Sequence, residues 1–320
     1  MTYRNPFPIL LIKMFRRTIF VAIIAVLSVA AGVAAAQDVD AFLSGSTVNC
    51  KACDLAGKNL SGRDLTGADL FKANLSGANL ENVILKAARL ELAVLDNANL
   101  AGANLADANF SRATAKVANF SNTILVRANF HRADISESNF ENSDMSLVTL
   151  NLATLRKANL RETLLSFSDF FMADLTFADL SNAYMWQGNM RRARMQRVNI
   201  SGVQFFETDM REARISGATT SPETNFTKSW LDDTNLRGLD LTGVNFSQAR
   251  MRNALLRDCN LTNTNFENVD LGAADLDDTI LEGTIFTNTN LLGVIMPNEG
   301  EGRELPAYEN TIMPDGKIRN

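Results

Sequence analysis

This sequence of 320 residues is poor in the side chains that most enzymes use for chemistry. It contains one histidine, His131, and three cysteines. A Ser-His-Asp or Cys-His site needs a histidine placed beside a nucleophile, and the common metal centres gather several histidines or cysteines. The sequence supplies neither set, and it has no glycine-rich phosphate loop. We therefore expect a protein that is not an enzyme and that binds no cofactor.

What the sequence does contain is a repeat of five residues. Leucine recurs at Leu55, Leu60 and Leu65, and the register continues with Leu, Phe, Ile or Met to Ile215. The residue two positions earlier is mostly small, as in Ala68-Asp69-Leu70. A period of five fits neither the 3.6-residue period of a helix nor the two-residue period of a strand. It therefore indicates a repeat architecture in which two of every five side chains point inward.

The unit resembles that of the pentapeptide repeat family, whose members wind an all-β solenoid, a right-handed quadrilateral parallel β-helix with one unit per side. The resemblance covers residues 50–296 and implies about 12 coils of about twenty residues each. One column of positions twenty apart supports such a coil, because it is almost uniformly asparagine from Asn59 and Asn79 to Asn199. Asparagines one coil apart are expected to form a hydrogen-bonded ladder.

The register shifts once, between Ile215 and Phe226, where the spacing is eleven residues and includes Pro222. One extra residue is most simply absorbed at a corner, where the missing N–H of proline costs no ladder hydrogen bond. In DNA-mimicking members of the family, long loops at such breaks act on the target. A single residue is too short for that role, so we expect the rod to continue.

Residues 1–36 are predicted to be a helical signal peptide. Lys13, Arg16 and Arg17 precede an uncharged run over residues 18–36 that ends in three alanines, which is typical of an export signal. We expect an exported protein, periplasmic or extracellular. The run is also long enough for an uncleaved inner-membrane anchor over residues 18–36, so membrane contact stays open as an alternative.

The chain is acidic, with a net charge of −5, and cleavage of the signal would remove basic residues only. An acidic rod resembles the family members that imitate DNA and inhibit a topoisomerase, but an exported protein would not meet that enzyme. Acidic surface more often provides solubility, and we expect no nucleic acid partner. Two outward acid pairs, Asp232-Asp233 and Asp277-Asp278, are typical of solvated surface, with calcium as the alternative.

Cys50 and Cys53 form a C-x-x-C pair, but both occupy inward positions of the repeat, as does Cys259. Core thiols and a structural disulfide between Cys50 and Cys53 both fit these positions, and an oxidising compartment favours the disulfide. Covalent haem attachment would need a histidine where Asp54 stands. Similar pairs lie just ahead of the first repeat in exported relatives, which implies that residues 37–49 and this pair cap the rod.

Sorting the outward residues by side of the prism reveals one apolar surface. It lies on the side centred on Leu165, Met185 and Phe205, and Trp186 and Phe206 are expected to stack directly on it. Exposed aromatic side chains bordered by arginine are typical of an interface centre. On a further side, Arg194 and Arg214 are expected to stack. The candidate interface consists of Leu164, Phe167, Phe171, Tyr184, Trp186, Phe206, Arg191, Arg192 and Arg211.

Three interpretations of this surface stay open. It is an interface for a protein partner or a second copy, it is covered by the chain's own N-terminal segment or C-terminal tail, or it has no role. A glycan stacked on Trp186 ranks below a protein, because few polar groups lie beside the ring. Residues 297–320 are predicted to be a tail that ends in a capping hairpin, since Pro-Asp-Gly separates two short apolar stretches there.

These observations predict a non-enzymatic exported rod that serves as a scaffold or protein-binding module through the candidate interface. A purely structural envelope rod and a DNA-mimicking inhibitor of the topoisomerase type stay open as alternatives.

Overall fold

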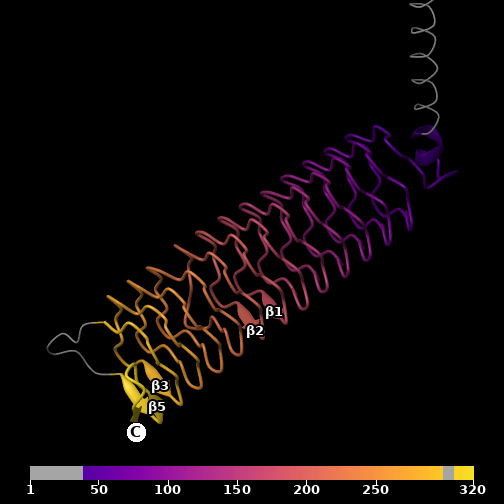
Figure 1. The fold of residues 1–320 in the computed structure, drawn as a ribbon. Coiled ribbons are helices and arrows are strands. Elements are labelled where there is room, and N and C mark those ends of the chain that lie inside the picture. The colour runs from indigo at the N-terminus through magenta and orange to yellow at the C-terminus, as the bar shows by residue number, and fades with distance from the viewer. Residues whose placement is uncertain (1–38, 298–305) are drawn as a thin grey trace, which may run out of the picture.

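The computed structural model describes residues 39–297 and 306–320, which form an elongated β-helix (Figure 1). Parallel backbone bridges join positions twenty residues apart, as in Asn59↔Asn79 and Asn79↔Asn99. Within one coil these bridges recur every five residues and so define four sides. The twenty-residue coil, implied by the family resemblance and supported by the asparagine column, is confirmed. The predicted signal helix, residues 1–36, lies outside the described residues.

Extended segments are short, because each side of the prism allows only a few residues between two corners. Strands β1 and β2 pair in parallel in the middle of the rod, and β3 and β4 do so near its C-terminal end. Strands β5 and β6 pair antiparallel as a hairpin. A short helix over residues 39–43 precedes the first coil. The strands are β1 (Tyr184–Trp186), β2 (Gln204–Phe206), β3 (Ile285–Thr287), β4 (Ala307–Glu309), β5 (Thr311–Ile312) and β6 (Ile318–Arg319).

The core is a set of columns in which equivalent side chains of successive coils stack on one another. Phe226, Phe246 and Phe266 are fully buried, and their ring centroids lie 4.9 and 5.3 Å apart along one column. Small residues such as Ala68 fill the narrower inward positions and are fully buried as well. Apolar burial contributes about 25 cal/mol per Å² wherever it occurs along the rod, so stability accumulates coil by coil without a globular centre.

Each corner is a tight turn that places one residue in the left-handed region of backbone space. The amide of Ala78 donates to the carbonyl of Leu75 at 3.0 Å, and such turns recur at most corners. Glycine and asparagine suit this position, as at Gly62 with φ 65° and Asn82 with φ 55°. Val117 occupies it with φ 57°, although its branched Cβ makes that conformation costly.

We therefore expect Val117→Asn to stabilise the rod by about 1 kcal/mol, because the left-handed conformation costs a branched residue roughly that much. Val117 is 55% exposed, so little apolar burial is lost. Urea unfolding compared with the wild type measures the change. Val126→Asn is the matched control, since Val126 is outward but has no positive φ; equal effects at both positions would contradict the argument.

The single added residue is absorbed without interrupting the rod. Gln204 bridges to Asn225, twenty-one positions on, whereas Asn225 bridges to Asn245 at the usual twenty. Pro222 packs over the next coil, where a Cβ added to Gly243 would meet the Cβ of Pro222 at 3.0 Å. The prediction that the extra residue is accommodated at a corner and the rod continues is confirmed.

The C-terminal residues 306–320 extend the rod at its end. Strand β4 pairs with β3, and the ring of Tyr308 stacks on that of Phe286 with centroids 5.6 Å apart. Ile312 bridges to Asn290, and the guanidinium of Arg319 lies 4.4 Å from the centroid of the Tyr308 ring. These residues therefore lie far along the rod from β1 and β2 (Figure 1), and the alternative that the C-terminal tail covers the candidate interface is wrong for residues 306–320. The N-terminal segment, the other cover considered, lies outside the described residues.

The N-terminal end is closed by residues that follow the predicted signal segment. Phe42, in the short helix, is fully buried. Its carbonyl accepts a hydrogen bond from Nη2 of Arg63 at 2.7 Å, and the Arg63 guanidinium lies 5.1 Å from the centroid of the Phe42 ring. Cys50 and Cys53 in the first coil are joined by a disulfide.

Candidate interface

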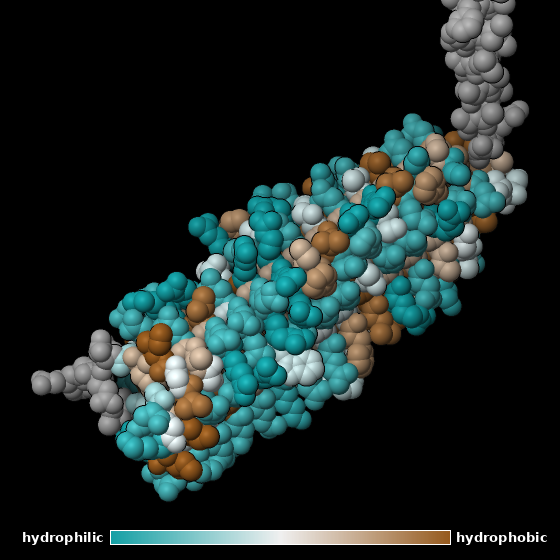
Figure 2. Space-filling model, in the orientation of Figure 1, coloured by the Kyte–Doolittle hydropathy of each residue, from teal (hydrophilic) through white to brown (hydrophobic). Residues whose placement is uncertain are grey.

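The apolar part of the candidate interface lies on the side that carries β1 and β2. Leu164 bridges to Tyr184 in the next coil, and Trp186 of β1 is in register with Phe206 of β2. Leu164 is 49% exposed, Phe167 44%, and Tyr184 and Trp186 39% each. Figure 2 shows hydrophobic side chains along the lower edge of the middle of the rod, beside the place of β1 and β2 in Figure 1. The large apolar side chains are therefore both adjacent and open to solvent.

The aromatic rings interlock differently from the prediction. Although Trp186 and Phe206 are in backbone register, their rings contact other partners: Trp186 packs edge-on against Phe167, with centroids 5.0 Å apart, and Phe206 lies 6.1 Å from Tyr184. Phe167 occupies a left-handed corner position with φ 59°. The corner conformation brings its ring against the neighbouring coil. Direct stacking of Trp186 on Phe206 is thus replaced by two tilted pairs that give a broader aromatic surface.

A carboxylate at the edge of this aromatic cluster is held by three neighbours. Nε2 of Gln187 donates to Oε2 of Glu207 at 2.7 Å, and Nζ of Lys228 lies 3.7 Å from Oε1. The hydrogen bond from Gln187 is the main cause that lowers the pKa of Glu207, with further contributions from Lys228 and Trp186. Glu207 is therefore ionised at neutral pH, and its charge is balanced by Lys228.

The arginines that border the apolar surface are paired with acids. Nη2 of Arg211 lies 2.5 Å from Oδ2 of Asp209. Nε of Arg192 lies 2.8 Å from Oε2 of Glu212, and Nη2 of Arg191 lies 3.7 Å from Oε1 of the same residue. The hydrogen bond from Arg192 lowers the pKa of Glu212. The sequence argument identified the arginines but missed Asp209 and Glu212, so the border carries little net charge.

Two aromatic residues next to this border take different positions. Phe171, predicted to belong to the interface, is only partly exposed. Trp230, which the sequence argument missed, is 46% exposed and lies with its ring centroid 5.8 Å from the guanidinium carbon of Arg211. Trp230 is twenty-one positions after Asp209 and bridges to it. Counting the columns across the added residue would have placed Trp230 beside Arg211.

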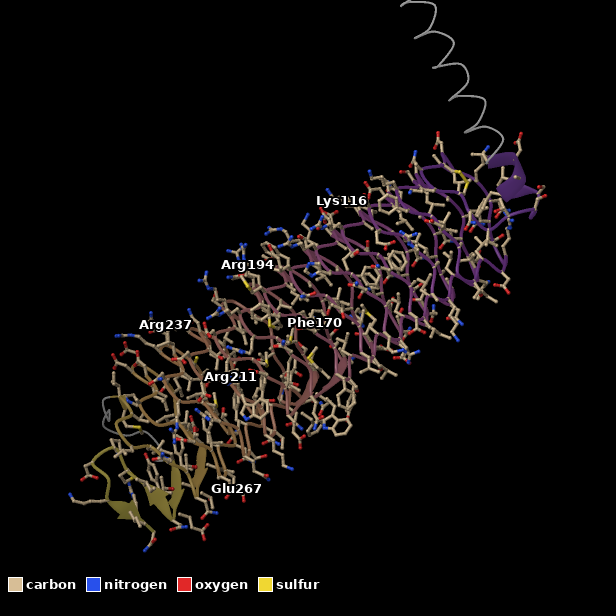
Figure 3. All side chains as sticks on the ribbon, turned by 45° about the vertical axis from the view of Figure 1, so that its right-hand side comes forward. Lys116, Phe170, Arg194, Arg211, Arg237 and Glu267 are labelled. Atoms are coloured by element: carbon tan, nitrogen blue, oxygen red, sulfur yellow. A yellow bond between two sulfur atoms is a disulfide. The ribbon has the colours of Figure 1, made fainter. Side chains whose placement is uncertain are left out.

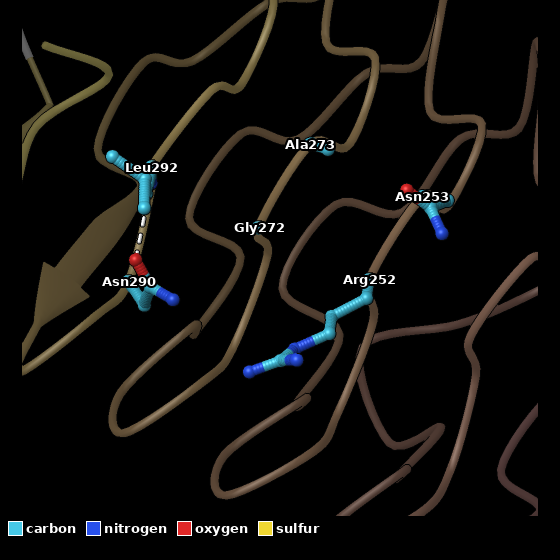
Figure 4. Close-up of a pocket in the computed structure, with 6 residues that line it drawn as sticks. All are labelled: Arg252, Asn253, Gly272, Ala273, Asn290 and Leu292. Carbon is cyan, nitrogen blue, oxygen red and sulfur yellow. Dashed lines mark hydrogen bonds between the residues drawn. The ribbon is translucent and has the colours of Figure 1, made fainter.

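A shallow hollow of about 380 Å³ opens on the side that carries Arg191 and Arg211, nearer the C-terminal end (Figure 4). It exists because two successive outward positions hold Gly272 and Ala273 instead of larger side chains. Arg252 is its one charged lining residue, and Nε of that residue is already bound to Asp270 at 2.5 Å. Its lining residues are Arg252, Asn253, Gly272, Ala273, Asn290 and Leu292.

The remaining candidates for chemistry are occupied by structural contacts. Nδ1 of His131 lies 2.8 Å from Oδ1 of Asn151 in the next coil. Asp232 is bound by Arg250 at 2.9 Å, and one guanidinium nitrogen of Arg257 lies 2.8 Å from Asp277 and 3.0 Å from Asp278. Over residues 39–297 and 306–320, His, Cys, Asp and Glu side chains form no group of three suited to a metal ion.

The third cysteine, Cys259, is buried in the core, and burial decides the protonation of its thiol. Burial raises the pKa of the Cys259 thiol to about 11, and the thiol donates to the carbonyl of Leu236 at 3.1 Å. This side chain is therefore a core residue with little thiolate at neutral pH. In the part of the chain that the structure describes, no helix has the length and apolarity needed to cross a membrane.

The chain is similar to several proteins of known structure. A solved structure of HetL, a pentapeptide repeat protein involved in heterocyst differentiation regulation in the cyanobacterium Nostoc sp. strain PCC 7120, is 23% identical over 88% of this chain and 98% of its own, with a TM-score of 0.31. QnrB1, a plasmid-mediated fluoroquinolone resistance protein, is 18% identical over 76% of this chain and 90% of its own, with a TM-score of 0.25. A search of curated proteins gave no match. The family model for pentapeptide repeats (8 copies) matches residues 49–86, 73–112, 118–151, 150–187, 173–212, 223–258 and 254–293.

Proposed function

Because the chain belongs to the pentapeptide repeat family and winds a right-handed β-helix, we propose that it is a non-enzymatic exported rod that binds another protein through the candidate interface. The observation that carries this proposal is the cluster of Phe167, Tyr184, Trp186 and Phe206, whose rings form two contacting pairs across three successive coils. Large exposed aromatic side chains dominate the binding energy of protein interfaces.

The chemistry of the border indicates what kind of partner fits. Arg191, Arg192 and Arg211 are paired with Asp209 and Glu212, so little unbalanced charge is left to attract a charged ligand. The partner should present an apolar surface with a polar rim, which is the usual composition of an interface centre. Binding of this partner should depend little on salt, because ion-paired surface charges leave little net charge for dissolved ions to screen.

The same pairing weakens the DNA-mimicking alternative. A DNA mimic needs acidic side chains that stay available to a basic protein, but many acids of this rod are matched by a base one coil away. Arg127 lies 2.6 Å from Asp107, and Lys157 lies 3.1 Å from Glu137. A purely structural envelope rod remains the competing function, and it predicts that the aromatic cluster can be removed without consequence.

Site-specific photo-crosslinking in cells tests the proposal. A photoreactive residue at Phe206 should give one crosslinked product of defined mass, whereas the same residue at Ser201, on the polar asparagine side, should give none. Replacing Trp186 with serine should lower the yield from Phe206 about tenfold or more, as expected for an interface centre. Ile124→Ser is the matched control, since Ile124 is 47% exposed on the same side but outside the candidate interface. Equal yields from Phe206 and Ser201 would favour the structural rod.

Export is tested separately on the same protein. Mass spectrometry of the full chain, expressed with a C-terminal tag in a Gram-negative host, should find Gln37 as the first residue. An intact Met1 in the membrane fraction would make the protein an anchored rod, and an intact Met1 in the cytosol would contradict export.

A further inference from the structure

The side of the rod centred on Met195, Ile215, Leu236, Leu256 and Leu276 has two halves of opposite charge. We call it the charged face. Figure 3 shows Arg194 and Arg237 along one edge of the rod, whereas Glu267, which belongs to the side that carries β1 and β2, lies along another. The basic half consists of Arg194, Arg197, Arg214 and Arg237. The acidic half consists of Asp258, Asp275, Asp277 and Asp278, with Arg257 among them.

The basic half is only partly neutralised by its own chain. Arg194 and Arg214 bridge as direct neighbours in adjacent coils, so two like charges lie side by side. Nη1 of Arg194 is 3.8 Å from Asp174, and the Arg197 guanidinium lies over the Phe177 ring at 5.5 Å. Within residues 39–297 and 306–320, Arg214 and Arg237 have no ion-pair partner. All four arginines are exposed, in a protein whose net charge is −5.

The acidic half has the opposite imbalance. Arg257 is shared between Asp277 and Asp278 at 2.8 and 3.0 Å, whereas Asp258 and Asp275 form no ion pair within the described part of the chain. Asp258 is exposed at a corner, and Asp275 accepts the backbone amide of Asp277 at 3.1 Å. The excess negative charge therefore lies in the two coils directly after the excess positive charge, on the same side of the prism.

This arrangement is self-complementary, and we propose that the charged face binds a second copy of this chain in an antiparallel, two-fold symmetric pair. In this pair the two-fold axis runs parallel to the strands through the coil of Leu236. Each outward column of one copy then faces the same column of the second copy, with the coils in reverse order. Arg194 then faces Asp275 of the second copy, and Arg197 faces Asp278 of the second copy. Because the pair is symmetric, each of these contacts occurs twice, once from each copy.

The centre of the face suits such a contact. Gly217 and Gly238 occupy corner positions there, with φ 68° and 69°, so these two corners place no side chain between the rods. Arg237 faces Arg237 of the second copy across the axis, and each of the two arginines lies within one coil of the position of the other copy's Asp258, which offsets their repulsion. Five coils span only about 20 Å at about 4.8 Å per coil, which is small for a permanent interface. The pair should therefore be weak, reversible and salt-dependent.

The pairing of two copies through the charged face is independent of the proposed function, because the charged face and the aromatic cluster lie on different sides of the rod. Salt separates them: association through the charged face should be lost at about 1 M salt, where the Debye length is about 3 Å, whereas binding at the aromatic cluster should persist. Trp186→Ser should leave the pairing of the charged face unchanged.

Sedimentation equilibrium of the full chain, as the host processes it, tests the inference at low ionic strength. The wild type should show a reversible dimer. Two charge reversals, Arg194→Glu with Arg197→Glu and Asp275→Lys with Asp278→Lys, should each weaken dimerisation about a hundredfold. Mixing these two variants should restore a dimer, because each new acid then faces a new base. Arg112→Glu with Arg132→Glu is the matched control, since both arginines are exposed on another side.

A wild type that stays monomeric at low ionic strength overturns the proposal. So does a mixture of the two variants that stays monomeric, or a control pair that weakens dimerisation as strongly as the charged-face variants. Vesicles with anionic lipid that bind a monomeric wild type, but not the Arg194→Glu and Arg197→Glu variant, would instead assign the basic half to a lipid surface.

Discussion

Replacing Phe246 with alanine should destabilise the rod by about 4 kcal/mol, within the range seen when a buried phenylalanine is truncated. Its ring lies between those of Phe226 and Phe266, with centroids 4.9 and 5.3 Å away. The cavity cannot close, because Asn245 bridges to both neighbouring coils and the amide of Phe246 donates to the carbonyl of Asn265 at 2.9 Å. Both neighbours therefore lose a stacking partner.

The damage should stay local, since each coil contacts only its neighbours and stability is close to a sum of coil and interface contributions. Amide hydrogen exchange followed by mass spectrometry should show the largest loss of protection over residues 225–266 and little change over residues 55–120. Phe246→Leu, which keeps most of the volume, should cost less than about 1.5 kcal/mol. A uniform loss of protection along the whole chain would contradict this local picture and indicate a single cooperative unit.

Sequence reasoning located the backbone of this rod well, because the five-residue period dictates which side chains point inward. The family resemblance implied a coil of twenty residues and the asparagine column supported it, and the shift of one residue between Ile215 and Phe226 was found at its observed place. These predictions depend only on register, which the pattern of large and small residues determines. The backbone contacts between coils then follow from counting twenty residues along the chain.

Side-chain contacts between columns were harder to predict. Register placed Trp186 over Phe206, but the left-handed corner at Phe167 brought another ring against Trp186. The sequence argument named the bordering arginines alone, whereas Asp209 and Glu212 pair with them. Such pairs depend on side-chain rotamers as well as on register, and a column count does not give rotamers. Of the charged face, the sequence predicted only the stack of Arg194 and Arg214.

Removing residues 306–320 should make the rods associate end to end. These residues cover the last coil: Tyr308 stacks on Phe286, the amide of Leu291 donates to the carbonyl of Ile312 at 2.8 Å, and the amide of Ala307 donates to the carbonyl of Thr284 at 2.9 Å. Without them an apolar ring and a row of unpaired backbone groups would face solvent. An uncovered strand edge is a template for pairing with another chain.

Light scattering coupled to size exclusion should therefore show particles much larger than a dimer, and they should persist at about 1 M salt, because apolar and backbone contacts are not screened. Arg319→Ala is the control, since it removes only the cation held 4.4 Å from the Tyr308 ring and should cost about 1 kcal/mol at most. If the shortened chain keeps the mass of the wild type, the last coil closes the rod by itself. The hairpin of β5 and β6 would then serve another purpose than capping.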